Sequence, residues 1–120
     1  SPATEIYEKI LFRFNQPETT YYFITANDEK VGVIRIVDGK DGVTRKRISP
    51  IFIMPEYRNQ GYAQQAIKEA ERIHGNQNWK LDTILQEEGN CYLYEKMGYH
   101  KTGQTHEINE RLTLVFYKKD

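Results

Sequence analysis

Apolar and polar residues alternate in some stretches of this chain, whereas in others apolar residues recur every three or four positions. Alternation is typical of strands with one buried face, and the longer period is typical of amphipathic helices. Gly, Pro, Asn and Asp separate most of these stretches and predict turns. The predicted order along the chain is a helix, three strands, a helix, a strand, a helix and two strands.

The predicted helices differ in what defines them. The first is predicted over residues 1–15, because Ser1-Pro2 is a favourable helix start and apolar residues then follow at helical spacing. The second has an apolar stripe over residues 63–75, and the third spans residues 89–98. The predicted strands are rich in β-branched and aromatic residues: Tyr21–Ala26, Val31–Val37, Val43–Met54, Trp79–Leu85, Tyr99–Ile108 and Leu112–Tyr117.

The connections between these strands predict the sheet. The turn Asn27–Lys30 makes the first two strands a hairpin. Proline cannot donate a ladder hydrogen bond, so a bulge is expected near Ser49-Pro50 in the third strand. The second helix separates the third strand from the fourth and requires a crossover, so these two strands should be parallel in a mostly antiparallel sheet.

Composition narrows the class of protein. At 120 residues, the chain fits a single domain over residues 1–120 with one modest core. The formal net charge is zero, and the only basic run, Arg45–Arg47, is more typical of a solvated strand start than of a nucleic-acid interface. No segment has the length of a membrane span and no secretory signal opens the chain. We therefore expect a cytoplasmic protein that binds neither nucleic acid nor a membrane.

The cysteine and histidine content argues against a metal site. Cys91 is the only cysteine, which excludes an internal disulfide and a cysteine-based metal site. His74, His100 and His106 lack metal-ligand spacing. No metal is expected.

The segment I-x-P-E-Y-R-N-Q-G-Y-A, from Ile53 to Ala63, carries the strongest chemical signal. It places a glycine-bearing turn directly before the second predicted helix. A helix N-terminus gathers unpaired backbone N–H groups and the positive end of the helix dipole. Such a turn can hold a phosphate or pyrophosphate, and its plainer interpretation is an ordinary helix start with a convenient glycine.

A second motif, N-C-Y-L-Y-E-K-M-G-Y, runs from Asn90 to Tyr99. In this order, with a helix and a strand between them, the two motifs resemble those of the GNAT superfamily of acetyl-coenzyme A-dependent N-acetyltransferases. The resemblance covers residues 21–118. It implies an α/β fold of the α+β type, with a mixed, mostly antiparallel sheet, a splayed parallel central strand pair and helices on both faces.

The resemblance also implies a binding site for acetyl-CoA. Backbone amides of the glycine turn would hold the pyrophosphate, and Gly61 would permit its close approach. The strand edge exposed by the splay would pair with the pantetheine arm, and Asn90 would bind the same arm, although simple N-capping would also explain an asparagine there. The implied residues lie on that edge, in the turn and at the start of the third helix: Ile51, Phe52, Ile53, Arg58, Asn59, Gln60, Gly61, Tyr62, Ala63 and Asn90.

The same resemblance implies direct transfer of the acetyl group to a primary amine. Tyr94 would be the general acid, because the departing thiolate needs a neutral O–H donor, and its plainer interpretation is core packing. A thiol mechanism through Cys91 is not favoured, since no activating histidine arrangement is evident. Glu87 or Glu88 could act as a base or could form a solvated turn, and no base is assigned.

Several alternatives stay open at this stage. The chain could be a non-catalytic module that senses acyl-CoA, or a domain that forms a homodimer through an exposed sheet edge. Before Tyr21 there is room for one helix only, so the first strand of the family is predicted to be missing. The chain could be truncated, could be a compact variant, or could borrow this element from a neighbouring chain. The amine acceptor is undetermined, and the acidic residues weakly favour a cation: Glu87, Glu88, Glu107 and Glu110.

Overall fold

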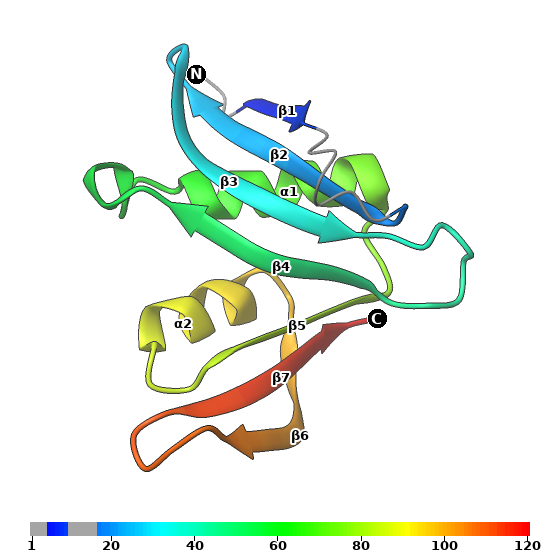
Figure 1. The fold of residues 1–120 in the computed structure, drawn as a ribbon, viewed down its shortest axis with the longest axis vertical. Coiled ribbons are helices and arrows are strands. Elements are labelled where there is room, and N and C mark those ends of the chain that lie inside the picture. Colours follow the sequence, from blue (N-terminus) through cyan, green and yellow to red (C-terminus); the bar gives the residue numbers. More distant parts are fainter. Residues whose placement is uncertain (1–4, 10–16) are drawn as a thin grey trace.

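The computed structural model describes residues 5–9 and 17–120. These residues form a seven-stranded sheet in the order β1-β2-β3-β4-β5-β7-β6. All neighbouring strands are antiparallel except β4 and β5, which are parallel (Figure 1). The strands are β1 Glu5–Lys9, β2 Thr19–Ala26, β3 Glu29–Val37, β4 Lys46–Ile53, β5 Trp79–Ile84, β6 His100–Glu107 and β7 Thr113–Lys119.

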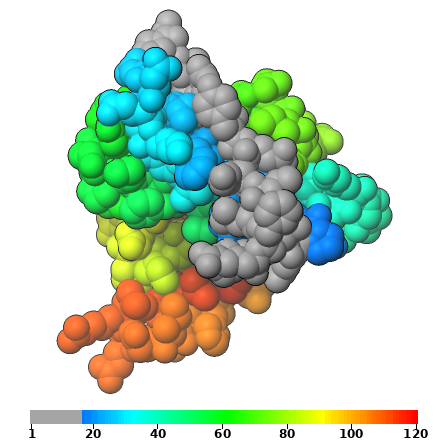
Figure 2. All heavy atoms as spheres, turned by 45° about the horizontal axis from the view of Figure 1, so that its top comes forward, coloured from blue at the N-terminus to red at the C-terminus, as the bar shows by residue number. Residues whose placement is uncertain are grey.

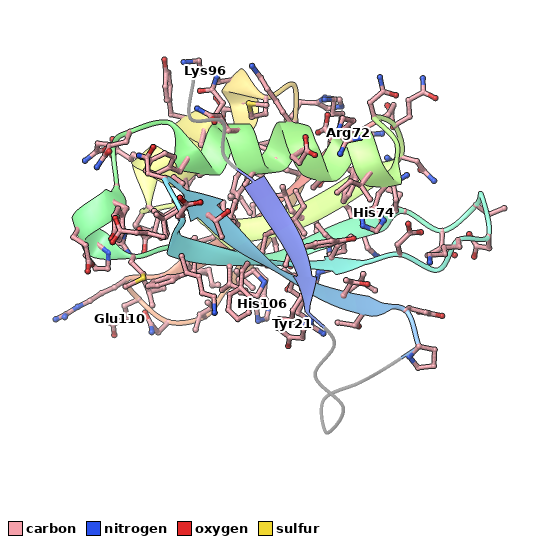
Figure 3. The ribbon with its side chains drawn as sticks, turned by 90° about the horizontal axis from the view of Figure 1, so that it is seen from above. Tyr21, Arg72, His74, Lys96, His106 and Glu110 are labelled. Carbon is pink, nitrogen blue, oxygen red and sulfur yellow. The ribbon has the colours of Figure 1, made fainter. Side chains whose placement is uncertain are left out.

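Two α-helices, α1 (Tyr62–His74) and α2 (Glu88–Lys96), lie on one face of this sheet (Figure 3). A short 3-10 helix, Pro55–Tyr57, precedes α1. The expected fold class, a mixed α/β sheet with a parallel central pair, is confirmed, but the described helices do not lie on both faces as expected. The β6–β7 hairpin forms one end of the molecule, in orange and red in Figure 2.

The prediction for the start of the chain was wrong in two respects. Residues Glu5–Lys9, expected to be helical, form strand β1, and β1 pairs antiparallel with β2 from Glu5 opposite Thr25 to Lys9 opposite Tyr21. The first strand, expected to be missing, is therefore present. An unpaired edge of β2 is a strong template for pairing, and this tertiary contact prevails over a weak helical period. The other parts of the predicted helix, residues 1–4 and 10–16, lie outside the described residues.

The bulge predicted in the third strand is confirmed. The register between β3 and β4 shifts between Ile34, which faces Ile51, and Ile36, which faces Ile48. Ser49 and Pro50 of β4 therefore oppose a single residue of β3, Arg35. Arg35 donates a hydrogen bond from Nη1 to the carbonyl of Ser49 at 3.1 Å, which satisfies a carbonyl that the irregular ladder displaces.

The central parallel pair separates almost at once. β4 and β5 are paired only at Lys46 with Trp79 and at Arg47 with Lys80. Beyond these residues β5 continues along β7, whereas β4 continues along β3. The two halves of the sheet diverge at this point, as the crossover and the family resemblance predicted.

The core lies between the sheet and the two α-helices. Two of the three alanines of α1, Ala66 and Ala70, are fully buried, and with Ile67 they let the helix approach the strands closely. The largest fully buried side chains are Trp79, Tyr99 and Tyr117. Within the described part of the chain, no helix is both long and apolar enough to cross a membrane.

Candidate active site

An open groove of about 820 Å³ lies where β4 and β5 diverge. Its walls come from the end of β4, the turn before α1 and the first turns of α2. The lining residues are Ile51, Phe52, Ile53, Tyr57, Arg58, Asn59, Gly61, Tyr62, Ala63, Gln64, Glu87, Gly89, Asn90, Tyr92, Leu93 and Lys96. Two segments that are far apart in the sequence, the glycine turn and the start of α2, thus face the same space.

The turn before α1 has the features of an anion site. Asn59 and Gly61 have positive φ angles of 63° and 82°, a conformation that brings successive backbone N–H groups toward one side. Gly61 caps α1, and no side chain caps this helix end. The first acceptor inside the helix is the carbonyl of Gly61, bonded by the amide of Gln65, so the amides from Gly61 to Gln64 have no acceptor within the helix.

The space in front of this turn is open. A Cβ built on Gly61 would meet no atom within 4 Å, so the absence of a side chain leaves the turn accessible from the groove. The exposed amides and the positive end of the α1 dipole therefore fit a phosphate or pyrophosphate. The residues present are compatible with coenzyme A in this position.

Two cationic side chains flank the groove. Arg58 donates from Nε to the carbonyl of Ile53 at 2.8 Å, and its guanidinium lies 5.3 Å from the centre of the Phe52 ring. These contacts hold Arg58 at the β4 side of the groove. Lys96 comes from α2 on the opposite side, with its Nζ 6.0 Å from the centre of the Tyr92 ring. The groove thus has positive charge on both walls, which favours an anionic ligand.

The wall formed by β4 offers backbone groups to a ligand. Ile51 and Ile53 are paired on one side with β3, opposite Ile34 and Gly32. On the other side, the ladder with β5 ends at Arg47. Among the described strands, none pairs with this side of Ile51 to Ile53, so an extended ligand could add to the sheet here.

Asn90 is placed differently from what was expected. Glu87 caps α2 and Asn90 lies within its first turn, where its amide donates to the carbonyl of Glu87 at 3.0 Å. N-capping therefore does not explain Asn90. Its side chain is exposed and lines the groove.

Tyr94 lies behind the groove and does not line it. Its side chain is 6% exposed and packs against the rings of Tyr99 and Tyr117, with centroid distances of 6.2 and 6.1 Å. Burial, together with the nearby negative charge of Asp82 and the neighbouring Cys91, raises the pKa of Tyr94 to about 12. The Tyr94 hydroxyl is therefore neutral, and it belongs to α2, the helix that packs against β5.

Most of the predicted binding residues meet in the groove, but the interpretation of their roles stays a prediction. Gln60 is exposed and does not belong to the lining. Six further lining residues were not predicted from the sequence: Tyr57, Gln64, Gly89, Tyr92, Leu93 and Lys96. Gly89, Leu93 and Lys96 recur at helical spacing, which could have indicated one face of α2. Cys91 is buried, with its Sγ 3.8 Å from the carbonyl of Ile84, as expected of a packing residue.

Comparison with known families decides the classification. The profile described as the acetyltransferase (GNAT) family matches residues 2–99. The chain belongs to this family. No curated protein sequence matches this GNAT acetyltransferase significantly.

Solved structures with the same fold include several acetyltransferases. A GNAT family acetyltransferase from Elizabethkingia anophelis with acetyl-CoA bound has a TM-score of 0.77 at 15% identity, over 100% of both chains. The IAA acetyltransferase of Bacillus cereus has a TM-score of 0.77 at 10% identity, over 98% of this chain and 99% of the other. A spermidine N-acetyltransferase of Vibrio cholerae in complex with CoA and spermine has a TM-score of 0.71 at 18% identity, over 84% and 64%.

Proposed function

We propose that this GNAT protein transfers the acetyl group of acetyl-CoA to the primary amine of an acceptor, with both substrates bound together. The observation that carries the proposal is the groove between β4 and β5, which joins an anion-binding turn, an unpaired strand edge and the first turns of α2 in one space. These are the three features that a ligand with a pyrophosphate and an extended, amide-containing arm requires.

The chain's own residues have separate roles in binding. The amides from Gly61 to Gln64 bind the pyrophosphate, and Arg58 and Lys96 add positive charge on either side. Backbone groups of Ile51 and Ile53 bind the pantetheine amides, and Asn90 binds the arm from the opposite wall. A backbone N–H near Ile51 or Phe52 is the proposed donor to the thioester oxygen.

Acetyl-CoA supplies an activated acetyl group in thioester linkage. The acceptor nitrogen forms a bond to the acetyl carbon, and the carbon–sulfur bond breaks. Tyr94 gives its hydroxyl proton to the departing sulfur, and the attacking nitrogen loses one proton, so the protons balance once Tyr94 is protonated again from solvent. Burial keeps Tyr94 in the neutral form that can donate.

An amine acceptor is supported by the fold relatives. One of them is a spermidine N-acetyltransferase solved with CoA and spermine. The acceptor of the present chain is a separate question, because the lining of an acceptor site varies between proteins with one fold.

Replacing Tyr94 by Phe tests the proposed role directly. Tyr94→Phe removes the donor while keeping the ring that packs against Tyr99 and Tyr117. We expect kcat for thiol release from acetyl-CoA to fall about 100-fold, since general acids contribute on the order of 100-fold or more. The affinity for acetyl-CoA, measured by calorimetry, should remain within about twofold.

Tyr21→Phe is the matched control, because Tyr21 is a tyrosine of β2 that does not line the groove. This variant should retain full turnover. Binding of acetyl-CoA without turnover in either the parent protein or the variants, over a broad amine panel, would instead identify a sensor of acyl-CoA. If acetyl-CoA did not bind at all, the proposed acetyl transfer would be wrong.

A further inference from the structure

A second pocket, of about 490 Å³, is built by strands alone. It is lined by residues of β5, β6 and β7 and by the start of β4, with Arg47, Lys80, Asp82 and Lys118 among them. Its volume lies in the range of pockets that take small molecules. The groove for acetyl-CoA shares none of these residues.

This second pocket opens on the face of the sheet away from the helices. Tyr117 of β7 is buried against α2, where its hydroxyl donates to Glu95 at 2.7 Å. Side chains alternate along a strand, so Phe116 and Lys118 project from the opposite face. His106, which is paired with the residue two before Phe116, also lies on that side, away from both helices (Figure 3).

Register brings the charges of this pocket together. Lys80 is paired with Arg47 on one side and with Lys118 on the other, so three cations lie in one row across three strands. Arg47 binds Asp82 at 3.2 Å, and Lys118 lies 3.7 Å from Asp120. Lys80 is exposed and makes no ion pair with any described residue.

The pocket has an excess of positive charge. Its cationic lining residues are Arg45, Arg47, Lys80 and Lys118, whereas Asp82 is the only carboxylate that the described residues contribute to it. Arg45 is already engaged by Asp120 and by the carbonyls of Trp79 and Lys119. Lys80, with the adjacent Arg47 and Lys118, is therefore left to bind an anionic group of a ligand.

The second pocket also borders the seam between β4 and β5. Arg47 and Lys80 are the last residues paired between β4 and β5, so the pocket borders the point where the gap between these strands opens. Asp82 lines the pocket, and its charge acts on Tyr94 from β5. A molecule in the pocket would thus have Asp82 and the start of the gap at one end, whereas Tyr94, on α2, lies on the other face of the sheet.

We infer that this pocket receives the acceptor, and that the acceptor is a small amine carrying a carboxylate or phosphate, with the anion bound at Lys80 and the amine directed toward Asp82. The inference rests on the proposed acetyl transfer and names its substrate class. A polyamine would meet uncompensated positive charge along this row of strands. The glutamates that suggested a cationic acceptor, at positions 87, 88, 107 and 110, are not part of this lining.

Matched amines test the inference. Thiol release from acetyl-CoA is measured with 4-aminobutyrate against butylamine, with phosphoethanolamine against ethanolamine, and with spermidine. We expect the anionic member of at least one pair to have a kcat/KM about tenfold higher or more, and the two pairs separate a carboxylate from a phosphate. The advantage should shrink at high salt, because the pocket is open to solvent.

Lys80→Ala should lower kcat/KM for the preferred anionic amine about tenfold and leave its uncharged partner unchanged. Lys101→Ala is the control, since Lys101 is exposed and is paired with Tyr117, on the helical face. A preference for butylamine, ethanolamine or spermidine would overturn the inference. So would calorimetry in which no anionic amine binds the coenzyme A-loaded protein in a Lys80-dependent way. Failure of acetyl-CoA itself to bind would overturn the proposed transfer, which is a separate outcome.

Discussion

At the scale of single residues, the proposed acetyl transfer depends on a tyrosine that keeps its proton. Tyr94 is enclosed by Tyr99 and Tyr117, and this burial raises its pKa more than the charge of Asp82 does. A general acid of this kind is present in its protonated form throughout the range in which amines lose their protons. The raised pKa also makes Tyr94 a weaker acid. Proton transfer to the departing thiolate therefore requires the sulfur to be held in a fixed position beside the hydroxyl.

Titration of Tyr94 is therefore predictable. Its midpoint, followed by NMR of the tyrosine ring carbons, should be at about 12. Asp82→Asn should lower this midpoint, because it removes a negative charge that opposes ionisation. Since the folded state binds the proton more tightly than the unfolded chain, stability from this group is complete below pH 10 and is lost as the pH rises toward about 12. A midpoint near 10.0, the ordinary pKa of tyrosine, would show that the hydroxyl is solvated.

The role of a single residue could be predicted from the sequence only where that role depends on residues adjacent in the chain. The glycine turn was identified because an open helix start is determined by adjacent residues, and Gly61 has the positive φ that the motif requires. Lys80 and Asp82 were not predicted as site residues, because the pocket that they line is formed together with residues of other strands. Asn90 was placed at the start of its helix correctly, but it lies three residues after the N-cap, Glu87, because the helix begins earlier than the motif suggested.

At the scale of elements, the C-terminal half of α1 is held by several side-chain contacts, whereas its N-terminus faces the groove. Its Glu71 is buried and accepts hydrogen bonds from Tyr99 at 2.9 Å and from Lys119 at 2.8 Å. Its last residue, His74, is bonded to Tyr22 at 2.7 Å and to Asp38 at 2.8 Å. These contacts join the helix to β2, β7 and the loop after β3, and so they hold the anion-binding turn in place before a ligand arrives.

Lys119→Met tests this anchoring. The change removes the cation that neutralises Glu71, and the carboxylate, whose side chain is only 9% exposed, would then be buried without its partner. We expect the free energy of unfolding in urea to fall by about 2 kcal/mol, below the usual cost of breaking a buried pair because Lys119 is partly exposed. Lys101→Met, on an exposed strand position, should change it by less than about 0.5 kcal/mol. Equal stability of the two variants would show that Glu71 is held by Tyr99 alone.

The elements that the sequence predicted well are those with internal signals. The period of α1, the turns of the β2–β3 hairpin and the irregularity at Pro50 all come from neighbouring residues. The third strand was predicted to begin at Val43 but begins at Lys46, because Asp41 accepts hydrogen bonds from the amides of Val43 and Thr44 and extends the loop. Strand β1 was missed for the opposite reason, since it is stabilised by pairing with β2 and not by its own sequence.

At the scale of the whole molecule, two half-sheets meet at a short seam. The ladder between β4 and β5 has only two residue pairs, yet it separates the proposed coenzyme groove from the proposed acceptor pocket. The splay was predictable, because a crossover helix implies a parallel pair and the motifs imply its opening. The acceptor pocket was not, because it assembles Arg47, Lys80 and Lys118 from three strands whose register no local pattern reveals.

A ligand that spans the groove should stabilise both half-sheets together. At a concentration of acetyl-CoA about 100 times its Kd, amides that open only when the ligand leaves should exchange up to about 100-fold more slowly, equivalent to about 2.7 kcal/mol. Hydrogen exchange followed by mass spectrometry should locate this protection in Ile51–Ile53, in the turn 59–64 and in the start of α2, residues 87–90. Strand β6, which is exposed along its length, should not respond and serves as the internal control.

Adenosine 3′,5′-diphosphate, which lacks the pantetheine arm, separates the two parts of this effect. It should slow exchange in residues 59–64 only, because nothing in it reaches the edge of β4 or the first turn of α2. If acetyl-CoA protected the turn but left Ile51–Ile53 unchanged, the arm would lie elsewhere and the strand-addition geometry would be wrong. If it protected β6 instead, the seam between β4 and β5 would not be the binding site. Protection on both walls at once would mean that the divergence of the two half-sheets is what the ligand recognises.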